Sequence, residues 1–126
     1  MGKLDQSETP IFSSLKDEYA ARNMAPFHVP GHKQGRGIDK DFYDYIGPNI
    51  FKIDVTIFEM VDGLHHPKSH IKKALTLTAD TFGAKESFFT VNGTSGGIQA
   101  MILSAVKPGE KILVPRNIHV SVSSGV

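Results

Sequence analysis

The sequence predicts an α/β fold with one parallel βαβ unit. Two short segments, at about 87–91 and 111–115, carry the aromatic and β-branched residues that favour strands. Between them, apolar residues recur at helical spacing, at Ile98, Met101, Ile102 and Ala105. A helix between two parallel strands makes a right-handed crossover. Because two strands under one helix leave edges unpaired and apolar faces uncovered, we expect this unit to be part of a larger sheet.

The first half of the chain predicts helices separated by a loop. Residues 7–23 are expected to form an amphipathic helix, with Thr9 as N-cap and Pro10 in the first turn. Residues 26–37 hold two prolines and three glycines, which predicts a loop. The loop is cationic at His28, His32, Lys33 and Arg36. Either it faces a carboxylate or phosphate, or it is a solvated turn.

Three further elements are expected before the first strand. A short helix over about 39–45 should end at Gly47-Pro48, and residues 53–58 form a weak strand or extended segment. Residues 68–82 predict a longer helix that stops at Gly83. Its expected buried face is Ile71, Ala74, Leu75, Thr78 and Phe82.

A glycine-rich turn at 93–97 carries the strongest chemical signal. It lies where the predicted helix begins, so free backbone N–H groups and the positive end of the helix dipole favour a phosphate. Thr94 and Ser95 can add hydroxyl donors, although an ordinary Ser/Thr-capped helix has the same local pattern. No Lys follows the glycines as a P-loop requires, and their spacing does not fit a dinucleotide loop. A smaller phosphate group is therefore favoured.

Composition excludes several classes of function. The 126 residues carry a net charge of +1 with no basic stripe among aromatics, so nucleic acid is not an expected partner. There is no cysteine, which fits a cytoplasmic protein, and neither a signal peptide nor a membrane span is visible. His66 and His70 have helical spacing, but Pro67 interrupts it and no carboxylate completes a ligand set. We therefore expect no metal site.

Short motifs are spread in order along nearly the whole chain. They are Phe27-His-Val-Pro-Gly-His-Lys-Gln-Gly35, Asp54-Val-Thr56, Asp62-Gly-Leu-His-His-Pro67, Phe82-Gly-Ala84, Asn92-Gly-Thr-Ser-Gly96, Lys107-Pro-Gly109 and Arg116-Asn-Ile-His119. Together their order and spacing resemble the Orn/Lys/Arg decarboxylase family. That family uses pyridoxal phosphate on an aspartate-aminotransferase-type fold (fold type I). The chain resembles the N-terminal part of a short-form member. The resemblance divides it into an N-terminal arm and loop, 1–47, and the incomplete start of the large domain, 48–126.

The resemblance implies a cofactor site. Thr94, Ser95 and the backbone N–H of Gly96 would hold the phosphate of pyridoxal 5′-phosphate, and His119 would stack on its ring. One departure lies beside this site, because Val120 follows His119 where family members usually have Lys. The arm would pack on a partner subunit of a homodimer or higher oligomer, although a mobile terminal helix is an equal alternative.

The implied activity is decarboxylation of arginine, lysine or ornithine, leading to polyamines or diamines. The family's Schiff-base lysine lies in a Ser-x-His-Lys context that is absent from these residues. We therefore expect no catalytic residue here and an inactive isolated chain. The alternatives are a non-catalytic truncated remnant, half of a split enzyme, or a small phosphate-binding module.

Overall fold

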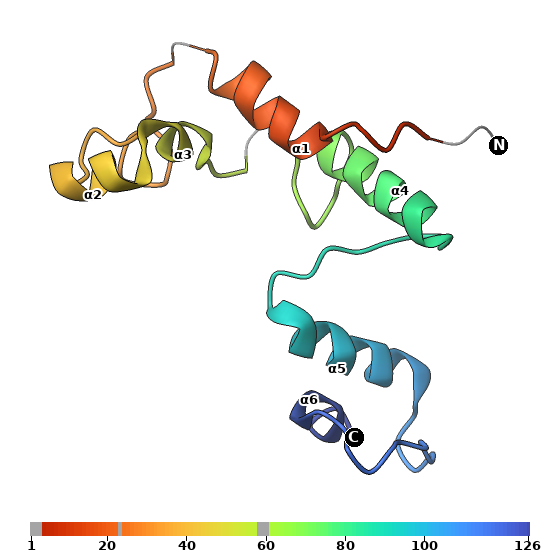
Figure 1. The fold of residues 1–126 in the computed structure, drawn as a ribbon. Coiled ribbons are helices and arrows are strands. Elements are labelled where there is room, and N and C mark those ends of the chain that lie inside the picture. Colours follow the sequence, from red (N-terminus) through yellow and green to blue (C-terminus); the bar gives the residue numbers. More distant parts are fainter. Residues whose placement is uncertain (1–3, 23, 58–60) are drawn as a thin grey trace. The chain divides into compact units, whose positions relative to one another are not determined.

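The computed structural model describes residues 4–22, 24–57 and 61–126, and these residues fold into two compact units. The first unit is Met1–Ser87 and the second is Phe88–Val126. Figure 1 shows that the regular structure of each unit is helical. Within the described ranges no residue belongs to a β-strand.

The arm begins as predicted and then changes its helical geometry. Helix α1, Pro10–Ser13, has Thr9 as its N-cap residue and proline in its first turn. It continues into the π-helical segment η1, Ser14–Tyr19, in which the N–H of Ala20 donates to the carbonyl of Leu15 at 2.9 Å. The helical arm is therefore shorter than the predicted 7–23, and Asn23 lies outside the described residues. Tyr19, at the end of η1, is 2% exposed and is the largest fully buried side chain.

Helix α4, His70–Phe82, is the longest element of the first unit, and its end agrees with the prediction. Gly83 takes the left-handed conformation (φ 62°, ψ 25°), which glycine adopts without steric cost. Leu75, Leu77 and Ala79 are buried. The expected burial of Phe82 is wrong, because this side chain is 80% exposed.

The N-terminal segment is fastened to α4 by side chains. The Gln6 amide donates to the Leu77 carbonyl at 3.2 Å and to Asp80 Oδ2 at 2.8 Å, and its oxygen accepts from the Thr81 hydroxyl at 2.9 Å. Glu8 pairs with Lys73. Since α1 also packs against α4, the arm has a docking site on its own chain.

Two short helices follow the loop at 26–37. Helix α2, Lys40–Ile46, is capped by Asp39, whose carboxylate accepts from two first-turn amides, and it ends at Gly47. Helix α3, Pro48–Ile53, was not predicted from the sequence; it starts with proline in its first turn. Its buried Phe51 stacks on Tyr43 of α2 with the rings 5.3 Å apart and 8° from parallel. This pair is the centre of the α2–α3 region.

The second unit consists of α5, Gly93–Ala105, packed against α6, Val120–Ser123. The helix of the predicted βαβ unit is present, but its two strands are not confirmed. Segments 87–91 and 111–115 have no regular secondary structure and do not pair with each other, and a strand is stabilised only by hydrogen bonds to a neighbouring strand.

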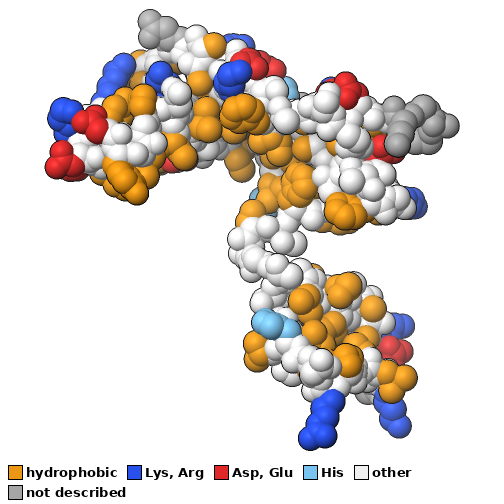
Figure 2. All heavy atoms as spheres, viewed as in Figure 1, with side chains coloured by type: hydrophobic (Ala, Val, Ile, Leu, Met, Phe, Trp, Pro, Cys, Tyr) orange, Lys and Arg blue, Asp and Glu red, His pale blue; other side chains and the backbone are white. Residues whose placement is uncertain are grey.

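Most apolar side chains of these two segments are exposed, as is Met101 of α5. Leu113 is 99% exposed, and Phe88, Val91 and Met101 are largely open to solvent. Ile102 is the one buried hydrophobic residue of 88–126, all of which are described. Figure 2 shows apolar side chains at the surface of this unit.

Candidate cofactor-phosphate site

The predicted phosphate ligands form the first turn of α5. Thr94, Ser95 and Gly96 follow Asn92, the N-cap residue, and Gly93. The Asn92 side chain makes no capping hydrogen bond, and the first turn contains no acidic residue. The first-turn amides of a helix have no partner within the helix itself. These amides therefore remain available to an external acceptor, with two exposed hydroxyls beside them.

At two positions of this turn the backbone favours glycine over any residue with a side chain. Gly93 has φ +72°, a conformation that other residues adopt only with strain. A Cβ built on Gly96 would lie 3.2 Å from the Asn92 Cβ, whereas one on Gly97 would meet Thr90 at an ordinary 3.6 Å. Gly93 and Gly96 are thus the two positions at which a side chain would disturb the turn.

His119 is the N-cap residue of α6, and its ring is held on one side. Nδ1 accepts from the Ser121 backbone N–H at 3.2 Å and lies 2.8 Å from the Ser121 hydroxyl. In the neutral ring the proton therefore sits on Nε2, which faces away from this cap. Gly125, which follows α6, lies close to Ile102 and Gln99 of α5, so a Cβ there would approach Ile102 to 3.0 Å. His119 and the glycine turn thus belong to one packed unit, although no hydrogen bond links them within 88–126.

Two histidines of the 26–37 loop have structural partners. Tyr19 Oη lies 2.7 Å from His28 Nε2, and His28 Nδ1 lies 2.5 Å from the Val29 carbonyl, so Nδ1 carries the proton and the phenol donates. His32 has the opposite tautomer: its Nδ1 accepts from the Gly35 N–H at 3.1 Å, and its Nε2 donates to Asp54 at 3.1 Å. These contacts tie the loop to Tyr19 of η1 and to Asp54 after α3.

Asp62 is a residue whose role the sequence analysis missed. Its carboxylate accepts from the backbone N–H groups of Gly63, Lys68, Ser69, Ile71 and Lys72 at 2.9–3.4 Å. Partial burial raises the pKa of this carboxyl, but the amide donors outweigh it and lower the pKa to about 2. The side chain thus caps the N-terminus of α4 from eight residues upstream.

Little in the sequence predicts the hydrogen bonds of Asp62 to the start of α4. A capping residue is normally sought next to its helix, whereas Asp62 acts across the Gly63-Leu-His-His-Pro67 turn. The one usable signal is the Pro67 that follows it just before the helix.

Among the described residues no three His, Asp or Glu side chains gather into a metal-binding group. His70 Nε2 lies 3.6 Å from Glu18 Oε2. No helix in the described parts of the chain is long and apolar enough to span a bilayer.

Comparison with known proteins gives one consistent family. Residues 9–126 match the family described as Orn/Lys/Arg decarboxylase, major domain. The arginine decarboxylase of Bacillus anthracis is 49% identical over 126 residues, which are 100% of this chain and 25% of the relative. That of Bacillus subtilis is 45% identical over 123 residues, or 98% and 25%. The constitutive lysine decarboxylase of Escherichia coli is 34% identical over 122 residues, or 91% and 17%. No solved structure matches the chain.

Proposed function

This chain belongs to the Orn/Lys/Arg decarboxylase family, and we propose that it supplies the cofactor-phosphate site of a basic amino acid decarboxylase. The chain spans about a quarter of the length of the arginine decarboxylases it matches. The activity of a whole enzyme is therefore part of the proposal. Over the aligned residues, the relatives named arginine decarboxylase are 45–49% identical to the chain, against 34% for a lysine decarboxylase. This difference favours arginine as substrate.

The single observation that carries the proposal is the open first turn of α5. Free amides, the Thr94 and Ser95 hydroxyls and the absence of any acid in this turn fit a phosphate dianion. In the proposal the Gly96 N–H and the two hydroxyls bind the phosphate. The His119 ring, held through Nδ1, lies against the cofactor ring.

The chemistry divides between cofactor and chain. Pyridoxal phosphate, when bound, supplies the electron sink that decarboxylation needs. The residues of this chain bind and orient it: donors at the phosphate fix its position, and a flat imidazole fixes the tilt of the ring. The Lys-bearing Ser-x-His-Lys segment that the family resemblance implies does not occur in these 126 residues. We therefore expect the pure chain to release no carbon dioxide from arginine, lysine or ornithine.

The test uses the chain itself and a cofactor analogue that cannot react with amines. Pyridoxine 5′-phosphate is titrated while the amide resonances of 93–97 and the His119 ring are followed by NMR. Pyridoxine and inorganic phosphate are titrated separately. We expect the 5′-phosphate to bind more tightly than either. The double variant Thr94→Ala/Ser95→Ala should bind at least about tenfold more weakly, since each hydrogen bond to a charged group is worth roughly 1.5–3 kcal/mol.

Ser104→Ala on the same helix is the matched control. Its hydroxyl bonds to the Met101 carbonyl, away from the glycine turn, so affinity should be unchanged. Equal binding of phosphate and pyridoxine 5′-phosphate would favour a simple phosphate-binding module. Unchanged affinity in the double variant would contradict the site.

A further inference from the structure

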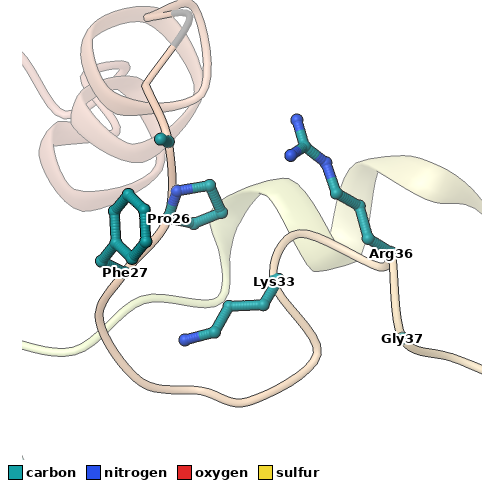
Figure 3. A pocket seen from close by; sticks show the side chains of 6 residues that line it. Pro26, Phe27, Lys33, Arg36 and Gly37 are labelled. Atoms are coloured by element: carbon teal, nitrogen blue, oxygen red, sulfur yellow. The ribbon is translucent and has the colours of Figure 1, made fainter.

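A second binding feature lies in the first unit, on the loop that the proposed function leaves without a role. A hollow of about 420 Å³ is lined by Ala25, Pro26, Phe27, Lys33, Arg36 and Gly37. This volume lies within the range of small-molecule sites. Figure 3 shows the Lys33 and Arg36 side chains leaving the loop on the side of Pro26 and Phe27, with their charged ends apart.

The lining is cationic and apolar at once. It contains two positive side chains and no acidic one, so its charge complements an anion. The Arg36 guanidinium makes none of the hydrogen bonds or ion pairs found among the described residues. By contrast, Lys33 Nζ donates to the His28 carbonyl at 2.7 Å. Arg36 is thus the anchor with free donors, and its planar fork suits a carboxylate or phosphate.

The apolar wall is exposed in a way that a binding role would explain. Phe27 is 93% exposed, whereas its neighbour Pro26 is buried. A phenylalanine at the surface of a hollow that an arginine also lines offers a flat face to a ligand ring. Carboxylate recognition by Arg36 and ring contact with Phe27 are therefore available within one hollow.

The backbone holds these groups in a fixed arrangement. Lys33, Gln34 and Gly35 are consecutive residues with positive φ, at 49°, 59° and 92°. Such strain persists only where surrounding contacts determine it. Here the contacts are the His32–Asp54 hydrogen bond and the packing of Gly35 against the Tyr43 ring, which leaves no space for a Cβ.

We propose that this hollow binds a small organic carboxylate with a flat apolar body, gripped by Arg36 with Lys33 adding charge and Phe27 stacking on the ring. This binding does not depend on the cofactor-phosphate site, whose residues lie in the other unit.

Benzoate is the probe, and the full 126-residue chain is titrated with it while NMR follows the amides of 25–37. Benzyl alcohol, of the same size but neutral, and inorganic phosphate, an anion without a ring, are the comparison ligands. We expect benzoate to shift the amides around Phe27, Arg36 and Gly37 with millimolar affinity, and both comparison ligands to bind more weakly. Arg36→Gln should weaken benzoate roughly fivefold to tenfold.

Lys68→Gln is the matched control, because it removes one exposed positive charge from the same unit outside the hollow. It should leave benzoate affinity unchanged. Since the Arg36 side chain is exposed and makes none of the hydrogen bonds or ion pairs found among the described residues, loss of folding is not expected in its variant, and an unchanged amide spectrum verifies this. The proposal is overturned if benzoate leaves 25–37 unshifted, if Lys68→Gln weakens it as much as Arg36→Gln, or if phosphate binds equally well.

Discussion

The two units differ in what holds them together. In the first, side chains distant in sequence meet: Gln6 bonds to α4 more than seventy residues later, and His32 bonds to Asp54. In the fully described residues 88–126, every side-chain hydrogen bond spans four residues or fewer. The first unit also buries Tyr19, Phe51 and three residues of α4, against Ile102 in the second.

The proposed cofactor site therefore lies on the unit that has fewer buried apolar side chains and only short-range side-chain hydrogen bonds. Its helix offers donors to a ligand, while most apolar side chains of the same unit are exposed to solvent. A buried apolar side chain contributes about 1.5–3 kcal/mol, so a unit with one such residue gains little from its own packing. Substitutions should therefore change the free energy of unfolding much more in the first unit than in the second.

The largest effect is expected for Tyr19→Ala. Removal of a fully buried aromatic ring costs roughly 3–5 kcal/mol in unfolding free energy, enough to loosen η1 and the loop that hydrogen-bonds to it. Tyr19→Phe keeps the ring and loses the bond to His28, at a cost of about 1 kcal/mol. Urea denaturation followed by circular dichroism, with hydrogen exchange in α4, measures both. Equal costs for the two variants would contradict the packing role of the ring.

A second substitution tests the strained loop. In Gly35→Ala the new Cβ would lie 2.4 Å from a Tyr43 ring carbon at φ +92°. We expect a loss of roughly 1–3 kcal/mol from strain and displaced packing. Gly37→Ala is the control, since nothing lies within 4 Å of its Cβ. If Gly37→Ala destabilised the unit as much, the close approach of Gly35 to Tyr43 would not be the cause.

Asp62→Ala should cost less, about 1 kcal/mol, as the loss of a helix cap does. The effect should appear first as faster hydrogen exchange at the amides of Ser69, Ile71 and Lys72. Ser87→Ala, at the end of the same unit and outside any side-chain hydrogen bond found among the described residues, is a control without this effect.

The charge on Asp62 also gives a pH dependence of known sign. Its pKa falls from 3.8 to about 2 on folding. The cap therefore contributes fully above pH 3.8 and is lost as pH falls toward 2. Asp62→Asn should flatten the stability profile over that interval. If the wild type and this variant showed the same slope of stability against pH, the charge on Asp62 would not stabilise the fold.

The smallest effect is expected in the second unit. Leu113→Ser changes a side chain that is 99% exposed, so unfolding free energy should move by less than about 0.5 kcal/mol. The same substitution should reduce concentration-dependent association, measured by sedimentation, because it removes apolar surface. A large loss of stability would mean that segment 111–115 has packing partners within this chain.

Helix starts, caps and ends, which depend on neighbouring residues, could be predicted from the sequence. Thr9-Pro10 marked the start of α1, Asp39 lay where α2 is capped, and Gly83 marked the end of α4. The glycine turn and the helix after it were also predicted, and Thr94, Ser95 and Gly96 lie at the start of that helix. In each case one residue and its nearest neighbours determine the backbone.

Other features depend on partners far along the chain and escaped prediction. The π-helical geometry of η1 accompanies the burial of Tyr19, the cap on α4 comes from Asp62, and Gln6 needs α4 to be formed. The strands expected at 87–91 and 111–115 have the right composition, but composition cannot supply the neighbouring strand that a ladder requires. The role of Thr94, Ser95, Gly96 and His119 as cofactor ligands remains a prediction.

The Gln6 contacts have a consequence for how the protein is made. Leu77, Asp80 and Thr81 emerge from the ribosome long after Gln6, but before any residue of the second unit. The N-terminal segment can therefore close onto α4 while 88–126 is still being translated, in the order usual for domains that fold during synthesis. The first unit would then be folded by the time the exposed apolar segments of the second are released.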